Sequence, residues 1–190
     1  REFKGELQRH ALARLHLRIR TPDAAHPTPS VAEVEQRINE ALRPWADRLR
    51  AALLQHHPEA LALGLAARYG NAFPLAYQED STAANAVEDI AALEAAIATP
   101  LQWHWRPYQL VTDSPGSLRL KLFRSGKPVP VADMLPLFES LGLKLLSERP
   151  YGLRQLDTPC WVQDFELQPR QGRVLTLDTD APRLLAALTA

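Results

Sequence analysis

The fold is decided by residues 118–151, which read LRLKLFRSGKPVPVADMLPLFESLGLKLLSERPY. Leucines alternate with polar residues over 118–122, which is the period of two that half-buries a β-strand. Turn residues at 125–128 end that strand. An amphipathic helix follows and ends at Gly142, with apolar positions at Val131, Leu135, Phe138 and Leu141. Apolar residues return over 143–147, so the stretch predicts a strand, a helix and a second strand.

Further elements flank this stretch on both sides. Upstream, Leu101, Trp103 and Trp105 alternate with polar residues, as in a strand. Downstream, the strand pattern of 161–167 places Trp161, Phe165 and Leu167 on one face, and a final helix begins at Ala181. The order β, β, α, β, β, α over 100–190 predicts an α+β fold, in which helices pack on one face of an antiparallel sheet.

Residues 30–99 have the pattern of helices instead. Ser30 and Glu33 form a capping box, and a continuous apolar stripe follows it at Val31, Val34, Ile38, Leu42, Trp45, Leu49 and Leu53. Pro44 interrupts the stripe, so we expect two helical pieces there. Another helix covers 58–69, with Gly70 as a left-handed C-terminal cap. Ser81 or Thr82 caps a third, which ends before Pro100.

The first 29 residues resemble neither of these parts. Leu15, Leu17 and Ile19 alternate with polar residues in a strand pattern, and the proline-rich connector 21–29 follows. The only methionine is Met134, so we expect Arg1 not to be a natural translation start.

Composition limits the class of protein. Lys and Arg number 22, as do Asp and Glu, so the basic surplus of a typical nucleic-acid-binding chain is missing. A single cysteine, Cys160, cannot form an internal disulfide and indicates a reducing compartment. The sequence contains neither an apolar run of roughly 20 residues nor a signal peptide, so we expect a cytoplasmic protein.

Catalytic motifs are missing from the sequence. The glycine spacing matches no phosphate-binding loop, and there is no G-x-S-x-G elbow. His56 and His57 are adjacent at a helix end, where their side chains diverge too far to hold one metal. The acidic pairs Glu79-Asp80 and Glu88-Asp89 are expected at helix starts or on solvated faces. Asp164 and Glu166 share one strand face and form a possible acid–base pair, although a solvent face is the favoured interpretation.

Several stretches resemble the large bacterial NAD-specific glutamate dehydrogenases. They are the 118–151 segment quoted above, ARYGNAFPLAYQED at 67–80, AVEDIAALE at 86–94, WVQDFELQ at 161–168, LARLHLRIRT at 12–21 and Trp45-Ala46-Asp47. The resemblance implies the N-terminal region of ACT-like domains and helical motifs that precedes the catalytic domain. It therefore implies no catalytic residue, no cofactor-binding residue and no metal ligand in this segment, with NAD bound elsewhere in the parent enzyme.

The same resemblance suggests a domain organisation. Residues 1–29 would be the terminal strands of a preceding ACT-like domain with a linker, 30–99 a helical segment, and 100–190 a ferredoxin-like ACT-type domain. ACT modules generally bind amino acids at the loop after the first strand. The corresponding residues here are Arg124, Ser125, Gly126 and Lys127, which form a possible effector loop. The loop reads RSGKPVPVADML, not the D-x-P-G-x-L form common in ligand-binding ACT modules.

Three functions follow as hypotheses. In the first, the chain is a non-catalytic regulatory or oligomerisation segment of a glutamate dehydrogenase, in contact with other domains of the same polypeptide and with neighbouring subunits. In the second, it is an autonomous ACT-type module that senses an amino acid through the Gly126 loop. In the third and least favoured, Trp103 and Trp105 stack on single-stranded RNA, although core packing explains these tryptophans better.

Overall fold

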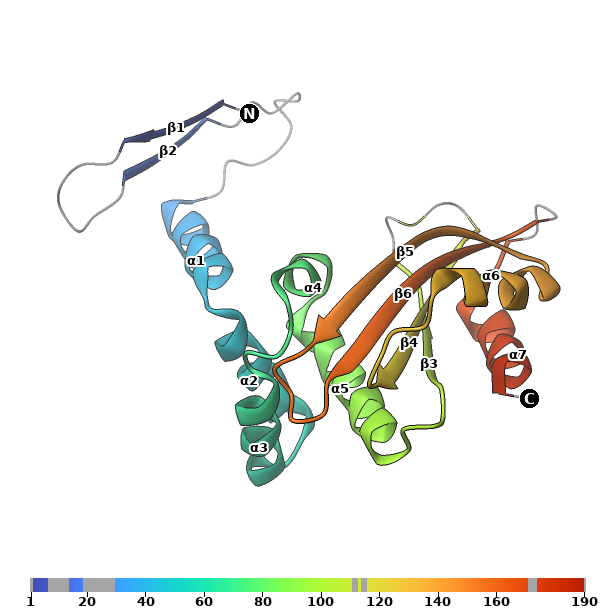
Figure 1. Ribbon diagram of the computed structural model, residues 1–190. Coiled ribbons are helices and arrows are strands. Elements are labelled where there is room, and N and C mark those ends of the chain that lie inside the picture. The colour runs from blue at the N-terminus through green and yellow to red at the C-terminus, as the bar shows by residue number, and fades with distance from the viewer. Residues whose placement is uncertain are drawn as a thin grey trace. The chain divides into compact units, whose positions relative to one another are not determined.

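The computed structural model describes residues 2–6, 14–18, 30–110, 113, 116–170 and 174–189 (Figure 1). The chain divides into two compact units, 1–42 and 43–190. Each unit is described by itself below. The domain boundaries expected after residues 29 and 99 stay predictions. Ile19 and the proline-rich connector 21–29 lie outside the described residues.

The first unit contains a hairpin and a helix. Strands β1 (Glu2–Glu6) and β2 (Arg14–Arg18) pair antiparallel. Helix α1 (Val31–Leu42) begins with the predicted capping box, in which the Ser30 N–H donates to the Glu33 carboxylate at 2.7 Å and the Glu33 N–H donates to Ser30 Oγ at 3.2 Å. The hydrogen bond that the Glu33 carboxylate accepts from the Ser30 N–H lowers the pKa of Glu33.

The second unit begins with four helices: α2 (Trp45–His56), α3 (Glu59–Tyr69), α4 (Leu75–Asp80) and α5 (Ala83–Ala98). Pro44 is the N-cap residue of α2, so the predicted break in the stripe is confirmed. Thr82 caps α5 by accepting the Asn85 N–H at 3.2 Å. Gly70 does end α3, but its φ of −52° is right-handed, so the predicted left-handed cap is wrong.

A four-stranded antiparallel sheet forms the rest of the second unit. Its strands are β3 (His104–Tyr108), β4 (Leu118–Ser125), β5 (Leu143–Leu153) and β6 (Cys160–Pro169), in the spatial order β3-β4-β6-β5. Helix α6 (Val131–Ser140) joins β4 to β5, and α7 (Leu177–Thr189) follows β6. Gly142, at φ +72°, takes the left-handed conformation that ends α6. The predicted α+β, ferredoxin-like fold is confirmed.

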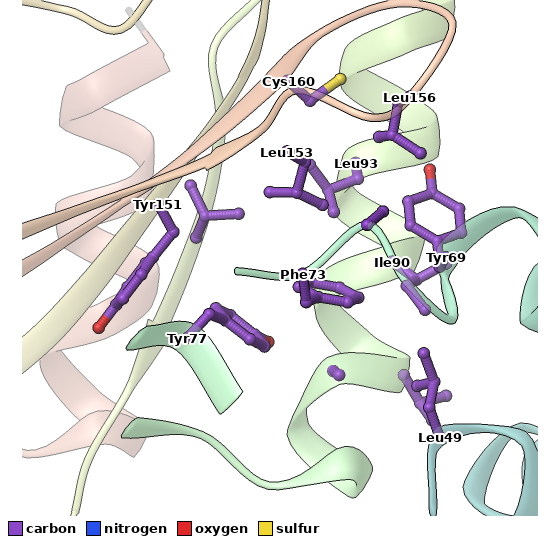
Figure 2. Close-up of a cluster of buried hydrophobic side chains, with 14 of the residues drawn as sticks. Leu49, Tyr69, Phe73, Tyr77, Ile90, Leu93, Tyr151, Leu153, Leu156 and Cys160 are labelled. Atoms are coloured by element: carbon purple, nitrogen blue, oxygen red, sulfur yellow. The ribbon is translucent and has the colours of Figure 1, made fainter. Parts of the chain in front are cut away.

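Helices cover both faces of this sheet. Leu118, Leu120 and Leu122 alternate along β4 and pack in one apolar cluster with α6 and with the partly buried leucines of α7. Phe123 and Val162 belong to a second cluster, together with side chains of α2 to α5. Figure 2 shows part of this cluster, in which Tyr77 and Phe73 lie near Tyr151 and Leu153 of β5. The ACT-type helices therefore take one face, as expected, while α2 to α5 cover the other.

Both edge strands carry a proline. Pro107 lies within β3 and Pro150 within β5, which also has an irregularity between Leu145 and Ser147. Proline has no N–H, so each edge lacks one donor that an added strand would need. Prolines and bulges of this kind protect sheet edges from pairing with other chains.

Candidate functional site

A buried ionic network joins the helical layer to the sheet. At its centre is Asp89 on α5, which is fully buried. The carboxylate accepts hydrogen bonds from Lys121 Nζ at 2.6 Å, Arg106 Nε at 2.7 Å and the Tyr77 hydroxyl at 2.5 Å. These three partners come from β4, β3 and α4. One acidic side chain thus connects two helices with two strands.

The network continues along the same face of the sheet through Arg119. Its guanidinium lies 2.6 Å from Asp113, 3.6 Å from Asp164 and 3.4 Å from Glu166. Asp164 also accepts a hydrogen bond from the Tyr108 hydroxyl. Burial raises the pKa of Asp164 and of Tyr108. Because each carboxylate already faces a cation or a hydroxyl, the arrangement is suited to holding layers together.

Two sequence-based expectations are wrong here. Asp164 and Glu166 do share a strand face, but that face is not solvated: α2 to α5 pack on it, and Asp164 is buried. Asp89 was expected on a solvated helix face and is instead fully buried. The helical spacing of Asp89 could have predicted this burial, because it places Asp89 on the apolar face of α5. The buried residues of that face are Ala86, Val87, Ile90 and Leu93.

The possible effector loop lies at the end of β4. Gly126 has a φ of +85°, and a Cβ placed on it would meet nothing within 4 Å. Its N–H donates to the Pro159 carbonyl at 2.8 Å, and its carbonyl accepts the Trp161 indole N–H at 3.2 Å. The structure brings Arg124 over the Trp103 ring, with the guanidinium carbon 5.8 Å from the centroid. Ser125 is buried, whereas Lys127 is exposed.

The cysteine and the histidines considered in the sequence analysis lie in the following places in the structure. Cys160 is buried, and that burial raises the pKa of its thiol to about 11, which disfavours the thiolate. His56 ends α2, and His57 is the C-cap residue. His104 Nε2 lies 2.8 Å from Thr99 Oγ1.

The two tryptophans of the RNA hypothesis differ in exposure. Trp105 is partly buried and packs against the apolar cluster of α6 and α7, while Trp103 is 36% exposed. Within the described part of the chain, no group of three or more His, Cys, Asp or Glu side chains could hold a metal.

A cavity of about 460 Å³ opens at the other end of the sheet. It lies between the end of α6, the start of β5, the end of β6 and helix α7. No loop residue from Arg124 to Lys127 lines it. Its walls are Leu118, Leu141, Gly142, Leu143, Pro169, Arg170, Leu175, Asp180, Arg183, Leu184 and Ala187.

Three family models of glutamate dehydrogenase match the chain in order. They are the ACT2 domain at residues 1–46, helical motif 2 at 52–96 and the ACT3 domain at 103–180. The chain belongs to the glutamate dehydrogenase family. The ACT3 match covers the four-stranded sheet with α6 and the start of α7, and the helical motif 2 match covers the layer packed on its other face.

Relatives agree with this assignment. The NAD-specific glutamate dehydrogenase of Halomonas elongata is 32% identical over 168 residues, which are 88% of this chain and 10% of that protein. The enzyme of the same name from Pseudomonas aeruginosa is 29% identical over 185 residues, 96% of this chain and 11% of that protein. That of Mycobacterium tuberculosis is 28% identical over 181 residues, again 11% of that protein.

The predicted resemblance to NAD-specific glutamate dehydrogenases is therefore confirmed. The chain spans about a tenth of the length of these relatives and corresponds to an ACT-containing segment of them. Among the residues that the structure describes, no helix combines the length and the apolar character needed to cross a membrane.

Proposed function

We propose that this chain is a non-catalytic regulatory and assembly segment of an NAD-dependent glutamate dehydrogenase. The parent enzyme would convert L-glutamate, NAD and water to 2-oxoglutarate, ammonia and NADH, with NAD bound outside this segment. The observation that carries the proposal is the ordered run of ACT2, helical motif 2 and ACT3 matches over nearly the whole chain. The single cysteine supports a reducing, cytoplasmic setting.

The buried network supports a role in coupling the movements of neighbouring domains. Asp89 ties α5 to β3 and β4 through ionic hydrogen bonds that are shielded from water. Charged hydrogen bonds in a buried site fix geometry more strictly than apolar contacts do. Helical motif 2 and the ACT3 sheet would then move as one body, so that a displacement at one would reach the other.

The exposed surface supports assembly through helices. The proline-bearing edges of the sheet disfavour strand pairing between subunits. Helices α2 and α3, by contrast, expose Leu54 at 41% and Leu61 at 51%. Exposed apolar side chains of this kind are suited to contacts with other domains of the polypeptide or with neighbouring subunits.

The proposal is tested in the intact parent enzyme by removing residues 100–190. We expect altered oligomer mass in light scattering or an altered response to amino-acid effectors. A milder variant, Leu54→Glu with Leu61→Glu, should change assembly without unfolding the core, and Gln55→Glu on the same helix as Leu54 is the matched control. Unchanged oligomer mass and unchanged effector response in the deletion enzyme would contradict the proposal.

The alternative is an autonomous module that senses an amino acid. The Gly126 loop favours it, because the left-handed glycine leaves open space beside the exposed Lys127. Calorimetric titration of the chain with the common amino acids tests this function. Saturable heat that disappears in Lys127→Ala would support sensing through the loop, and silence across the panel would contradict it.

A further inference from the structure

The cavity beneath α7 is apolar at its base. Leu118 and Leu143 are almost fully buried there, and Leu175 is 8% exposed. Leu141 and Leu184 are partly buried and complete the apolar wall. Gly142 contributes no side chain, and the space where its Cβ would lie is open. A volume of about 460 Å³ lies within the usual range of small-molecule sites.

Charged side chains line the remaining wall. Arg170 forms an ion pair with Glu139 at 2.6 Å. Asp180 accepts hydrogen bonds from the Thr176 N–H at 2.9 Å and from its hydroxyl, and so caps the start of α7. Arg183 is exposed, and within the described residues it has no hydrogen bond or ion pair to another side chain. The N–H donors of the Arg183 guanidinium are therefore available to a ligand in the cavity.

This combination selects a class of ligand. An apolar base with one available guanidinium matches an organic anion that has an apolar tail. Glu139 offsets the charge of Arg170, and Asp180 adds a negative charge to the wall, so a doubly charged phosphate is disfavoured. We propose that this cavity binds a small monocarboxylate with an apolar tail, whose carboxylate pairs with Arg183.

Such a ligand would fix α7 against the sheet. Its tail would contact leucines of β4 and β5, and its carboxylate would contact the middle of α7. The site lies at the end of the sheet opposite the Gly126 loop, so it is distinct from the possible effector loop. Only its regulatory purpose rests on the proposed function. Binding is tested on the chain alone, so one can fail while the other holds.

The test uses 4-phenylbutyrate as the probe and 4-phenylbutan-1-ol as its uncharged counterpart, each titrated into the full 190-residue chain. Backbone amide NMR shifts locate the site and give the dissociation constant. We expect saturable shifts at Leu143, Arg170 and Ala187, with about fivefold weaker binding of the alcohol. Arg183→Gln should weaken binding of the acid by about the same factor and leave the alcohol unaffected.

Two further variants complete the test. Arg154→Gln, at an exposed arginine that does not line the cavity, is the matched control and should bind like the unaltered chain. Ala187→Trp should occlude the cavity and abolish the shifts, while the rest of the amide spectrum shows that the fold is retained. Shifts confined to other residues, equal affinity for acid and alcohol, or unchanged affinity in Arg183→Gln would overturn the proposal.

Discussion

Asp89 on α5 and Lys121 on β4 meet at 2.6 Å with 0% and 2% of their side chains exposed. Arg106 on β3 reaches the other carboxylate oxygen and also pairs with Glu88 at 2.5 Å, so the two acidic side chains balance the two cations. Burying these charges is costly, and the ionic hydrogen bonds offset that cost only while every partner is present. Asp89 is therefore the buried centre of the ionic contacts between helical motif 2 and the ACT3 sheet, beside the apolar cluster that the two share.

Loss of that carboxylate should be more harmful than loss of its lysine partner. Asp89→Leu leaves the buried Lys121 without its carboxylate and leaves Arg106 with Glu88 alone, at 2.5 Å, and it should lower the free energy of unfolding by about 3–5 kcal/mol. Lys121→Met leaves Asp89 with Arg106 and Tyr77 and should cost about 1–2 kcal/mol. Urea unfolding of the chain measures both variants. An equal or larger cost for Lys121→Met would contradict this account of the network.

Two glycines of the helical layer should respond oppositely to alanine. Gly64 lies inside α3, and a methyl group added there would have nothing within 4 Å, so Gly64→Ala should stabilise by about 0.5–1 kcal/mol. At Gly70 a Cβ would lie 2.7 Å from the Ala66 carbonyl oxygen, which is backbone and moves little, so Gly70→Ala should destabilise. The thermal unfolding midpoints of the two variants test this prediction. Midpoint shifts of the same sign in both variants would contradict it.

The tyrosines should not ionise until the protein unfolds. Burial raises the pKa of all four, Tyr69, Tyr77, Tyr108 and Tyr151, above their ordinary value of 10.0. Above that pH the unfolded chain loses phenolic protons that the folded chain keeps, so stability falls as pH rises. Phenolate absorbance should therefore increase together with the loss of circular dichroism. Ionisation of any tyrosine near its ordinary pKa in the folded chain would argue against these contacts.

Gly152 on β5 should be sensitive to size because the Trp161 ring lies against it. A Cβ there would come within 3.0 Å of the ring. Gly152→Val should cost about 1–3 kcal/mol and displace the indole N–H from the Gly126 carbonyl, which NMR of the indole proton detects. In a Trp161→Leu background the same change should cost much less. A cost independent of Trp161 would place the strain elsewhere.

Much of the fold follows from local patterns. The alternation over 118–122, the capping box at Ser30 and the break at Pro44 each depend on neighbouring residues, and each is found where the sequence places it. The left-handed cap predicted at Gly70 is wrong because a glycine at a helix end allows that conformation without requiring it. Helix α4 is only six residues long, too short for a periodic pattern to reveal.

The buried network could not be predicted in the same way. Alternation along β4 assigns Lys121 to the face opposite Leu120 and Leu122, and a lysine there is usually solvated. Whether that face meets water depends on whether α5 packs on it, a contact between residues 32 positions apart. The position of Asp89 among apolar residues of α5 is the one local sign in the sequence that Asp89 is buried. Its partner Lys121 is then buried with it.

The central claim is that this chain is a segment of a large glutamate dehydrogenase, and the most direct measurement is the size and activity of the endogenous polypeptide. An antibody against the chain is used on a native gel stained for glutamate-dependent reduction of NAD and on a denaturing immunoblot. We predict a polypeptide roughly ten times larger than 21.2 kDa that coincides with the stained activity. A polypeptide near 21.2 kDa, separate from that activity, would contradict the account.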